Sequence, residues 1–118
     1  MRHLLILLSF IGCTHAEPWD TTDKVLGTTV VALQIVDWGQ TRYLAKHPEL
    51  GFYENNKLLG DHPSVGRVDV YFPALIVGTW LIADWLSPPN RKLFLGVVTV
   101  VNVAVTSRNR SIGLKVAF

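Results

Sequence analysis

Cysteine is nearly absent from this chain of 118 residues, because Cys13 is its single cysteine. One cysteine excludes an intramolecular disulfide and any zinc site built from cysteines. Charge is scarce too, since 17% of the residues are charged, against about 25% in a typical soluble domain. The formal net charge of +2 comes without a basic stripe and interleaved aromatic residues, so we expect no nucleic-acid binding. Nucleophile-elbow, phosphate-loop and Cys–His motifs are missing as well.

Apolar residues are what the chain has in quantity: they make up 49% of it, and they gather in runs near residues 25–44, 68–86 and 93–106. The third run is rich in valine and would suggest a buried strand in water, but beside two other apolar runs it favours a short or tilted helix. A chain of this length has room for one domain. We therefore predict an all-α membrane protein with three transmembrane helices near 24–46, 68–86 and 92–107, in a single membrane domain spanning 17–118.

The ends of these helices carry local signals. Thr21 or Thr22 can cap the first helix, and His47 before Pro48 ends it, because a residue before proline disfavours the helical region. Pro73 lies in the first turns of the second helix, where proline costs little. The sequence Ser-Pro-Pro-Asn at 87–90 stops that helix.

Residues 1–16 are typical of an export signal. A short positive stretch at 1–3 precedes an apolar stretch at 4–12, which is too short to span a bilayer. Two kinds of processing compete: cleavage after Ala16, or lipidation of Cys13 in an imperfect lipobox that has Phe10 where leucine is usual. Retention as an uncleaved anchor is the third alternative.

The distribution of basic residues predicts one orientation. Seven of them lie around the 47–67 loop or after the third run, and three lie on the other side. The larger group comprises Arg42, Lys46, Lys57, Arg67, Arg108, Arg110 and Lys115, and the smaller group Lys24, Arg91 and Lys92. The positive-inside rule then places the loop and the C-terminal tail in the cytoplasm. The mature N-terminus is periplasmic, as an export signal requires, in a multi-pass protein of the bacterial inner membrane.

The tail at 111–118 alternates and ends in Phe118, like the last strand of an outer-membrane barrel. A barrel alternates in every strand, however, and the runs at 25–44 and 93–106 do not. The tail is therefore expected to be a strand or an amphipathic end that lies on the membrane surface.

A polar stripe crosses the first apolar run. Gln34, Asp37, Gln40 and Thr41 are three or four residues apart and share one face of a helix. Polar groups at membrane depth are costly and usually face a bundle interior or a wet cavity. Asp37 has two interpretations: a proton carrier, ligand or catalytic carboxylate, or a packing group whose hydrogen bonds fix the bundle.

The loop at 47–67 is the second candidate region. Glu54, Asp61, His62 and His47 could gather around a divalent metal or serve as acid and base, although their spacing matches no known zinc helix. The alternative is turn chemistry, with Asp61 or Ser64 capping the second helix.

A third cluster, Thr99, Asn102 and Thr106, can bond across to the Asp37 stripe, and packing is its expected role. The predicted polar site thus consists of Asp37, Gln40, Thr41, Glu54, Asn56, His62, Ser64 and Asn102. The sequence identifies no catalytic residue, metal or cofactor.

Several segments together resemble a group of uncharacterised small membrane proteins of bacteria and their phages. They are Asp37-Trp38-Gly39-Gln40-Thr41-Arg42, Tyr53-Glu54-x-Asn56, Leu59-Gly60-x-His62-Pro63-Ser64, Asp69-x-Tyr71-Phe72 and Arg108-Asn109-x-Ser111-x-Gly113. The group usually has proline after the loop asparagine, where this chain has Lys57. The resemblance implies an inner-membrane protein of unassigned function, and it supplies no catalytic residue.

Two functions are therefore expected from the sequence, and a third, a proton or ion pathway, would need an oligomer to supply enough helices. The first is a non-enzymatic accessory protein, phage- or prophage-encoded, that contacts membrane lipid and binds other membrane proteins or itself, or modifies the envelope. The second is a membrane-embedded enzyme or metal-binding protein that uses Asp37, Glu54 and His62. These three side chains meet only if the loop folds back over the helix ends.

Overall fold

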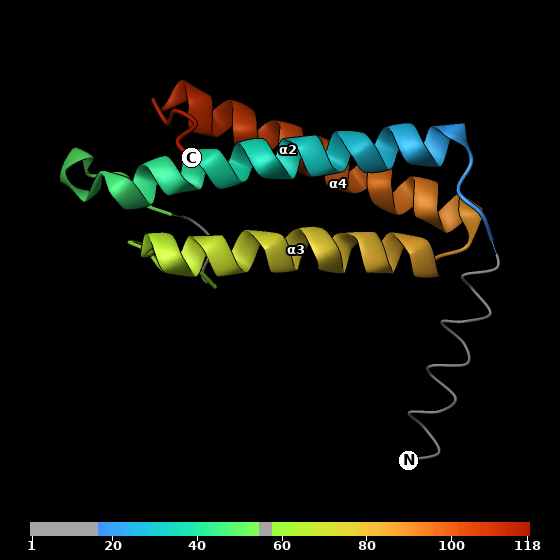
Figure 1. The fold of residues 1–118 in the computed structure, drawn as a ribbon. Coiled ribbons are helices and arrows are strands. Elements are labelled where there is room, and N and C mark those ends of the chain that lie inside the picture. Colours follow the sequence, from blue (N-terminus) through green and yellow to red (C-terminus); the bar gives the residue numbers. More distant parts are fainter. Residues whose placement is uncertain (1–16, 55–57) are drawn as a thin grey trace, which may run out of the picture.

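The structure is a computed structural model that describes residues 17–54 and 58–118. These residues form three α-helices, α2 (Thr21–Lys46), α3 (Val65–Trp85) and α4 (Pro88–Ser111), and a 3-10 helix, η1 (Pro48–Leu50), with no strand among them (Figure 1). The predicted all-α fold is confirmed. Among the described helices, α3 is long and apolar enough to cross a membrane. The predicted export signal, with Cys13 and Ala16, lies outside the described residues.

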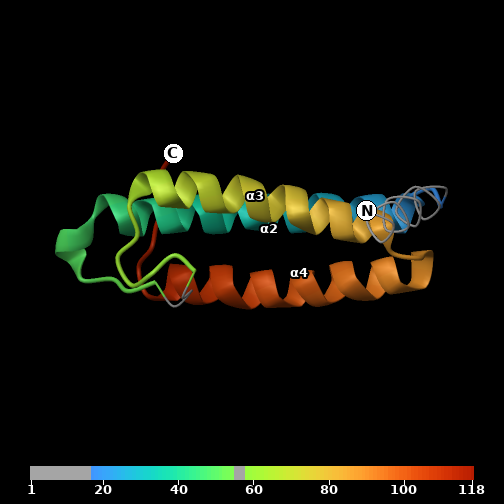
Figure 2. The ribbon, with the colours of Figure 1, turned by 90° about the horizontal axis from the view of Figure 1, so that it is seen from below.

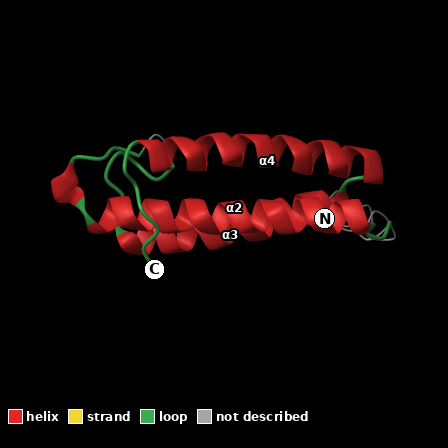
Figure 3. Ribbon diagram, turned by 90° about the horizontal axis from the view of Figure 1, so that it is seen from above, coloured by secondary structure: helices red, strands yellow, loops and turns green. Residues whose placement is uncertain are grey.

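Helix α2 is the centre of the bundle. Both α3 and α4 pack along α2, and they contact each other far less. Figures 2 and 3 view the bundle from below and from above and show α4 lying apart from α3 over most of its length. Because α3 runs antiparallel to the other two, one end of the bundle holds the starts of α2 and α4 and the end of α3 (Figure 1). We call this the start end. The opposite end, which holds residues 47–54 and 58–64 and the C-terminus, is called the loop end.

Helix α2 starts one residue earlier than a Thr21 cap would place it and two residues earlier than a Thr22 cap would. Asp20 is the N-cap: its carboxylate accepts from the Asp23 backbone N–H at 2.8 Å, and the Asp23 carboxylate accepts from the Asp20 N–H at 3.0 Å. This reciprocal pair satisfies two free N–H groups of the first turn. The prediction of Thr21 or Thr22 as the cap is therefore wrong.

The boundaries of the other helices follow from serine and proline. Ser64 caps α3 by accepting from the Arg67 N–H at 3.1 Å, so α3 begins at Val65, three residues before the predicted start. Helix α4 begins at Pro88 rather than near residue 92. Proline suits the first helical position because no hydrogen bond is lost there. The predicted end of α2 at His47 is confirmed.

Polar side chains fill much of the interior, and apolar ones cover much of the surface. Within residues 17–54 and 58–118, eight polar or charged residues are buried: Asp23, Gln34, Gln40, Thr41, Thr79, Arg91, Asn102 and Thr106. Large apolar side chains of α3 and α4 face outward instead, with Val70 72% and Val100 70% exposed. A soluble domain shows the reverse distribution, with polar side chains mostly outside.

Arg91 connects the three helices at the start end. Its side chain is fully buried and pairs with the buried Asp23 carboxylate at 3.1 Å. Its Nε donates to the Ala83 carbonyl at 2.8 Å, and Nη2 donates to the Leu86 carbonyl at 3.1 Å. The last carbonyls of a helix have no partner within the helix and attract cations, so this guanidinium caps α3 while it neutralises a carboxylate of α2.

The segment before α2 is held by the same group. Arg91 also donates to the carbonyls of Glu17, at 3.1 Å, and Pro18, at 3.4 Å, and lies over the Trp19 ring. Lys92 adds contacts of 2.9 Å to Asp23 and 2.8 Å to Asp20. The hydrogen bond from Lys92 lowers the pKa of Asp20 below its ordinary value.

The loop end is held by Arg42 and the tail. Arg42 pairs with Asp69, which also accepts from the Trp38 indole N–H at 2.9 Å. Arg42 donates to the Ala117 carbonyl at 3.1 Å, and the Ala117 N–H donates to the Gly39 carbonyl at 3.0 Å. The tail thus packs on α2, and the alternative of a strand is wrong.

Glycine is required at position 39 because the tail comes so close to α2. A Cβ there would lie 2.7 Å from the Phe118 ring and would also clash with Val116. Glycine therefore permits a contact that any larger residue would displace.

We expect Arg91→Met to lower the free energy of unfolding by about 3–5 kcal/mol, the usual cost of removing one partner from a buried ion pair. The substitution leaves Asp23 with Lys92 and the Asp20 N–H, and it removes the Arg91 donor from the carbonyls at the end of α3. Denaturant titration in detergent micelles, followed by circular dichroism, measures the change. Arg110→Met is the matched control, since Arg110 is exposed in the last turn of α4. Equal effects of the two substitutions would contradict the role given to Arg91.

Candidate functional site

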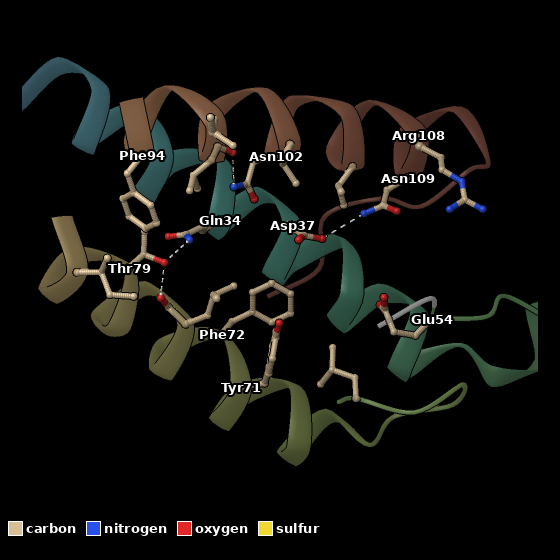
Figure 4. A pocket seen from close by; sticks show the side chains of 17 residues that line it. Gln34, Asp37, Glu54, Tyr71, Phe72, Thr79, Phe94, Asn102, Arg108 and Asn109 are labelled. Atoms are coloured by element: carbon tan, nitrogen blue, oxygen red, sulfur yellow. Dashed lines mark hydrogen bonds between the residues drawn. The ribbon is translucent and has the colours of Figure 1, made fainter. Parts of the chain in front are cut away.

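A cavity of about 620 Å³ lies between α3 and α4, with α2 as its floor (Figure 4). Its walls are mainly apolar, and its polar groups come from all three helices and from Glu54 in the segment after η1. The lining residues are Gln34, Asp37, Glu54, Leu59, Tyr71, Phe72, Leu75, Thr79, Ile82, Phe94, Val97, Val98, Val101, Asn102, Val105, Arg108 and Asn109. The cavity exists because α3 and α4 both pack on α2 but scarcely on each other.

Asp37 lies at this cavity and is hydrogen-bonded. Its Oδ1 accepts from the Asn109 amide at 3.2 Å and from the Thr41 hydroxyl at 3.4 Å. The same Asn109 amide donates to Gln40 Oε1 at 3.0 Å, and Gln40 Nε2 donates to the Thr106 carbonyl at 3.1 Å. The bonds with Asn109 and Thr106 join α2 to α4, so the predicted site residues Asp37 and Gln40 form a polar seam between two helices. Thr41, also predicted, bonds to Asp37 from within α2.

Glu54 reaches the same cavity because the segment after η1 folds back toward the bundle (Figures 2 and 4). The Glu54 backbone N–H donates to the Asp61 carbonyl at 3.0 Å, which holds this fold-back. Two predicted carboxylates, Asp37 and Glu54, therefore line one space. Arg108 lines it as well and brings a positive charge to its loop end.

The other predicted loop residues lie elsewhere. His62 is exposed, and the centroid of its ring lies 5.0 Å from that of the Tyr53 ring. Ser64 is occupied as the cap of α3, and His47 contacts Glu49 at 3.0 Å. Asn56 lies outside the described residues. Among the described residues, no group of three His, Cys, Asp or Glu side chains is placed to hold a metal ion.

The third predicted cluster bonds within its own helix. Thr99, Asn102 and Thr106 donate to the carbonyls four residues earlier, at 2.7–2.8 Å. These side chains could have bonded to the Asp37 stripe, but they donate to carbonyls of α4 itself. Asn102 and Thr106 are buried, as the expected packing role requires. Asn109 makes the contact with the stripe instead. It continues the three- and four-residue spacing of Asn102 and Thr106, and this spacing was the signal that could have found it.

Gln34 contributes a polar group with unusual surroundings. It is 1% exposed, and its Nε2 donates to Thr79 Oγ1 at 3.1 Å. The Thr79 hydroxyl uses its proton on the Leu75 carbonyl at 2.7 Å, so its oxygen can only accept from Gln34. This fixes the orientation of the Gln34 amide. Its Oε1 has no hydrogen-bond partner among the described residues.

Comparisons with family models, curated proteins and solved structures find no match to this chain. The resemblance to small membrane proteins of bacteria and their phages stays a prediction. The fold and the site define a small helical bundle that has a polar seam inside and apolar side chains outside.

We expect Asn109→Ala to destabilise the bundle by about 1 kcal/mol, within the range measured for hydrogen bonds between membrane helices. The substitution removes the amide that bridges Asp37 and Gln40. Asn90→Ala, in the exposed first turn of α4, is the control and should cost less. Denaturant titrations of the two variants, compared with the parent chain, give both values. Identical midpoints for all three proteins would show that the bridge adds nothing to stability.

Proposed function

We propose that this protein is a multi-pass integral protein of the bacterial inner membrane, phage- or prophage-encoded, with a non-enzymatic accessory role in which it associates with other membrane proteins or with itself. The observation that carries the proposal is the distribution of side chains: buried polar residues join the helices, and large apolar residues face outward. In water, neighbouring exposed apolar side chains of this kind mark a surface that contacts another protein or a membrane. In a bilayer it is the favourable arrangement.

Helix length supports three crossings. At 1.5 Å per residue, α3 is about 32 Å long, α4 about 36 Å and α2 about 39 Å, against roughly 30 Å for the hydrocarbon core. The ion pairs of Arg91 and Arg42 lie near the two ends of the bundle, where charged groups reach the interface at lower cost. The less charged middle of each helix then occupies the hydrocarbon.

The distribution of basic residues supports the predicted orientation. Arg42, Lys46 and Arg67 lie at the loop end, and Arg108, Arg110 and Lys115 lie there too, after the middle of α4 or in the tail. At the start end, Arg91 is buried in its ion pair, which leaves Lys24 and Lys92 nearer to the surface. The loop end is therefore the cytoplasmic side by the positive-inside rule, and the mature N-terminus is periplasmic.

The polar groups of the interior support a non-enzymatic role. Asp23 is paired with Arg91 and Lys92, and Asp37 accepts from Asn109 and Thr41. The bonds from Arg91, Lys92 and Asn109 join α4 to α2, and the bond from Thr41 lies within α2. The outer faces of α3 and α4 carry exposed apolar side chains, such as Val77 and Val100, that can pack against lipid or against helices of another protein.

We expect the full chain to stay in the membrane pellet after alkaline carbonate extraction, because its exposed apolar side chains are more stable in lipid than in water. In a Cys13→Ser background, Glu49→Cys should be labelled from the cytoplasm and Asn90→Cys from the periplasm, because the two exposed positions lie at opposite ends of the bundle. A membrane-impermeant maleimide, applied to spheroplasts and to inverted vesicles, measures this. Release by carbonate, or labelling of both positions from one side, would contradict a multi-pass protein.

Affinity capture of a tagged chain from gently solubilised inner membranes should recover either a membrane protein partner or a second, differently tagged copy. The reason is the large apolar surface of α3 and α4, which no described part of the chain covers. Partner identification by mass spectrometry, with an unrelated tagged membrane protein as control, gives the answer. Recovery of neither partner nor second copy would remove the accessory role while leaving the membrane location intact.

A membrane-embedded enzyme or metal-binding protein is the second candidate function, because Asp37 and Glu54 line one cavity. His62, its third expected member, is not among the lining residues. Calorimetric titration with Zn²⁺ separates the two functions. Stoichiometric binding that Glu54→Gln abolishes would favour the second function, and the accessory role predicts no such binding.

A further inference from the structure

We propose that the cavity between α3 and α4 is a binding groove for a single-chain amphiphile whose head group donates hydrogen bonds, either an alcohol or a primary amine. The ligand would enter from the bilayer, so the inference rests on the proposed membrane location. It adds a ligand class to a space that the accessory role leaves unused.

The size of the groove favours a small molecule over a helix. Its volume of about 620 Å³ lies within the range of roughly 300–1,000 Å³ found for small-molecule sites. A helix about 10 Å wide fills roughly 400 Å³ per 5.4 Å turn. The groove would therefore hold little more than one turn of a partner helix, whereas a flexible alkyl chain fits along it.

The walls provide the surface that an alkyl chain needs. Phe94, Val97, Val101 and Val105 lie on one side, along α4, and Leu75 and Ile82 lie on the other, along α3. Val97 and Val101 are each 54% exposed, although they line the cavity. The groove is thus open along α4 to whatever surrounds the bundle, which in a membrane is lipid.

The floor of the groove specifies the head group. Gln34 Oε1 is a buried acceptor without a partner among the described residues, and the Thr79 hydroxyl fixes its orientation. A buried acceptor left unpaired costs free energy, and a donor from a ligand would remove that cost. Asp37 is three residues further along α2, about 4.5 Å away along the axis, and it adds a carboxylate that accepts hydrogen bonds.

The charges in the groove discriminate between head groups. Asp37 and Glu54 are two carboxylates and Arg108 is one guanidinium among the lining residues, so the site is richer in acceptors than in cationic donors. An ammonium or hydroxyl group matches this lining. A carboxylate head group would meet like charge and would leave the oxygen of Gln34 unsatisfied.

The test uses the full chain in phosphatidylcholine nanodiscs, with ¹³C-labelled valine methyls and ¹⁵N-labelled side-chain amides. Dodecylamine, dodecanol and dodecanoate are added in turn at equal mole fraction in the bilayer. The amine and the alcohol should shift the methyl signals of Val101 and Val105 and the amide signals of Gln34 in a saturable way. Dodecanoate should not produce these shifts.

Two variants connect the binding to the groove. Val101→Trp fills it from the α4 wall and should abolish the saturable shifts, whereas Val103→Trp, on the same helix but outside the lining, should retain them. Gln34→Leu removes the unpaired acceptor and should weaken binding roughly tenfold, the equivalent of one hydrogen bond. Matching helical circular dichroism of each variant and the parent chain controls for folding.

Each result has a distinct meaning. Equal shifts with all three amphiphiles would leave a lipid-filled groove without head-group selectivity and would overturn the proposal, as would the absence of saturable shifts. Either result would leave the membrane location standing, because the chain is already in the nanodisc. Failure of the chain to enter nanodiscs would overturn the proposed function and this inference together.

Discussion

The arrangement of the helices depends on the hydrogen bonds and the ion pair of the buried Arg91 guanidinium. This guanidinium lies where the start of α2, the end of α3 and the start of α4 meet, and it bonds to all of these except its own helix. A buried cation needs many partners to offset its desolvation, and free carbonyls at a helix end supply them. Arg42 performs a similar task at the loop end, where it joins α2 to Asp69 of α3 and to the tail. Ionic contacts hold the bundle together at its start end and at its loop end. Helices α3 and α4 therefore need not contact each other in the middle of the bundle, and the cavity lies there.

Much of the fold could be predicted from the sequence, because long apolar runs, prolines and a serine cap are local signals. The three helices lie where the apolar runs lie, and His47 ends α2 as expected. What local signals could not supply was the pairing between distant residues. Arg91 was counted as one of three basic residues on the side of the start end, yet it is the most completely paired residue of the bundle. Its position beside Lys92, just after two prolines, gave no indication that Asp23, 68 residues earlier, would be buried with it.

The segment at 37–42 shows why part of the candidate site could be found from sequence. Its polar members all lie where helices meet: Asp37 and Gln40 contact Asn109, and Arg42 contacts Asp69. Gly39 admits the tail. The three- and four-residue spacing of the stripe identified the face of α2 that is buried against its neighbours. The spacing could not identify which residue of α4 would bond to the stripe, since Asn102 and Asn109 lie on the same face of α4 and differ in their position along the helix axis.

The polar seam also explains why, among the described helices, α3 is the one whose composition is apolar enough for a membrane span. Helices α2 and α4 carry residues that bond to each other across the interior, namely Asp37, Gln40, Thr106 and Asn109. The average apolarity of both helices is therefore lowered by polar groups that face the interior of the bundle. Helix α3 contributes fewer such groups and remains apolar along its length. Helices that carry a shared polar interior need be apolar only on their outer faces, and the exposed valines of α4 meet that condition. Under the proposed multi-pass topology, α2 and α4 would cross the bilayer with their polar side chains satisfied inside the bundle, which lowers the cost of placing those groups at membrane depth.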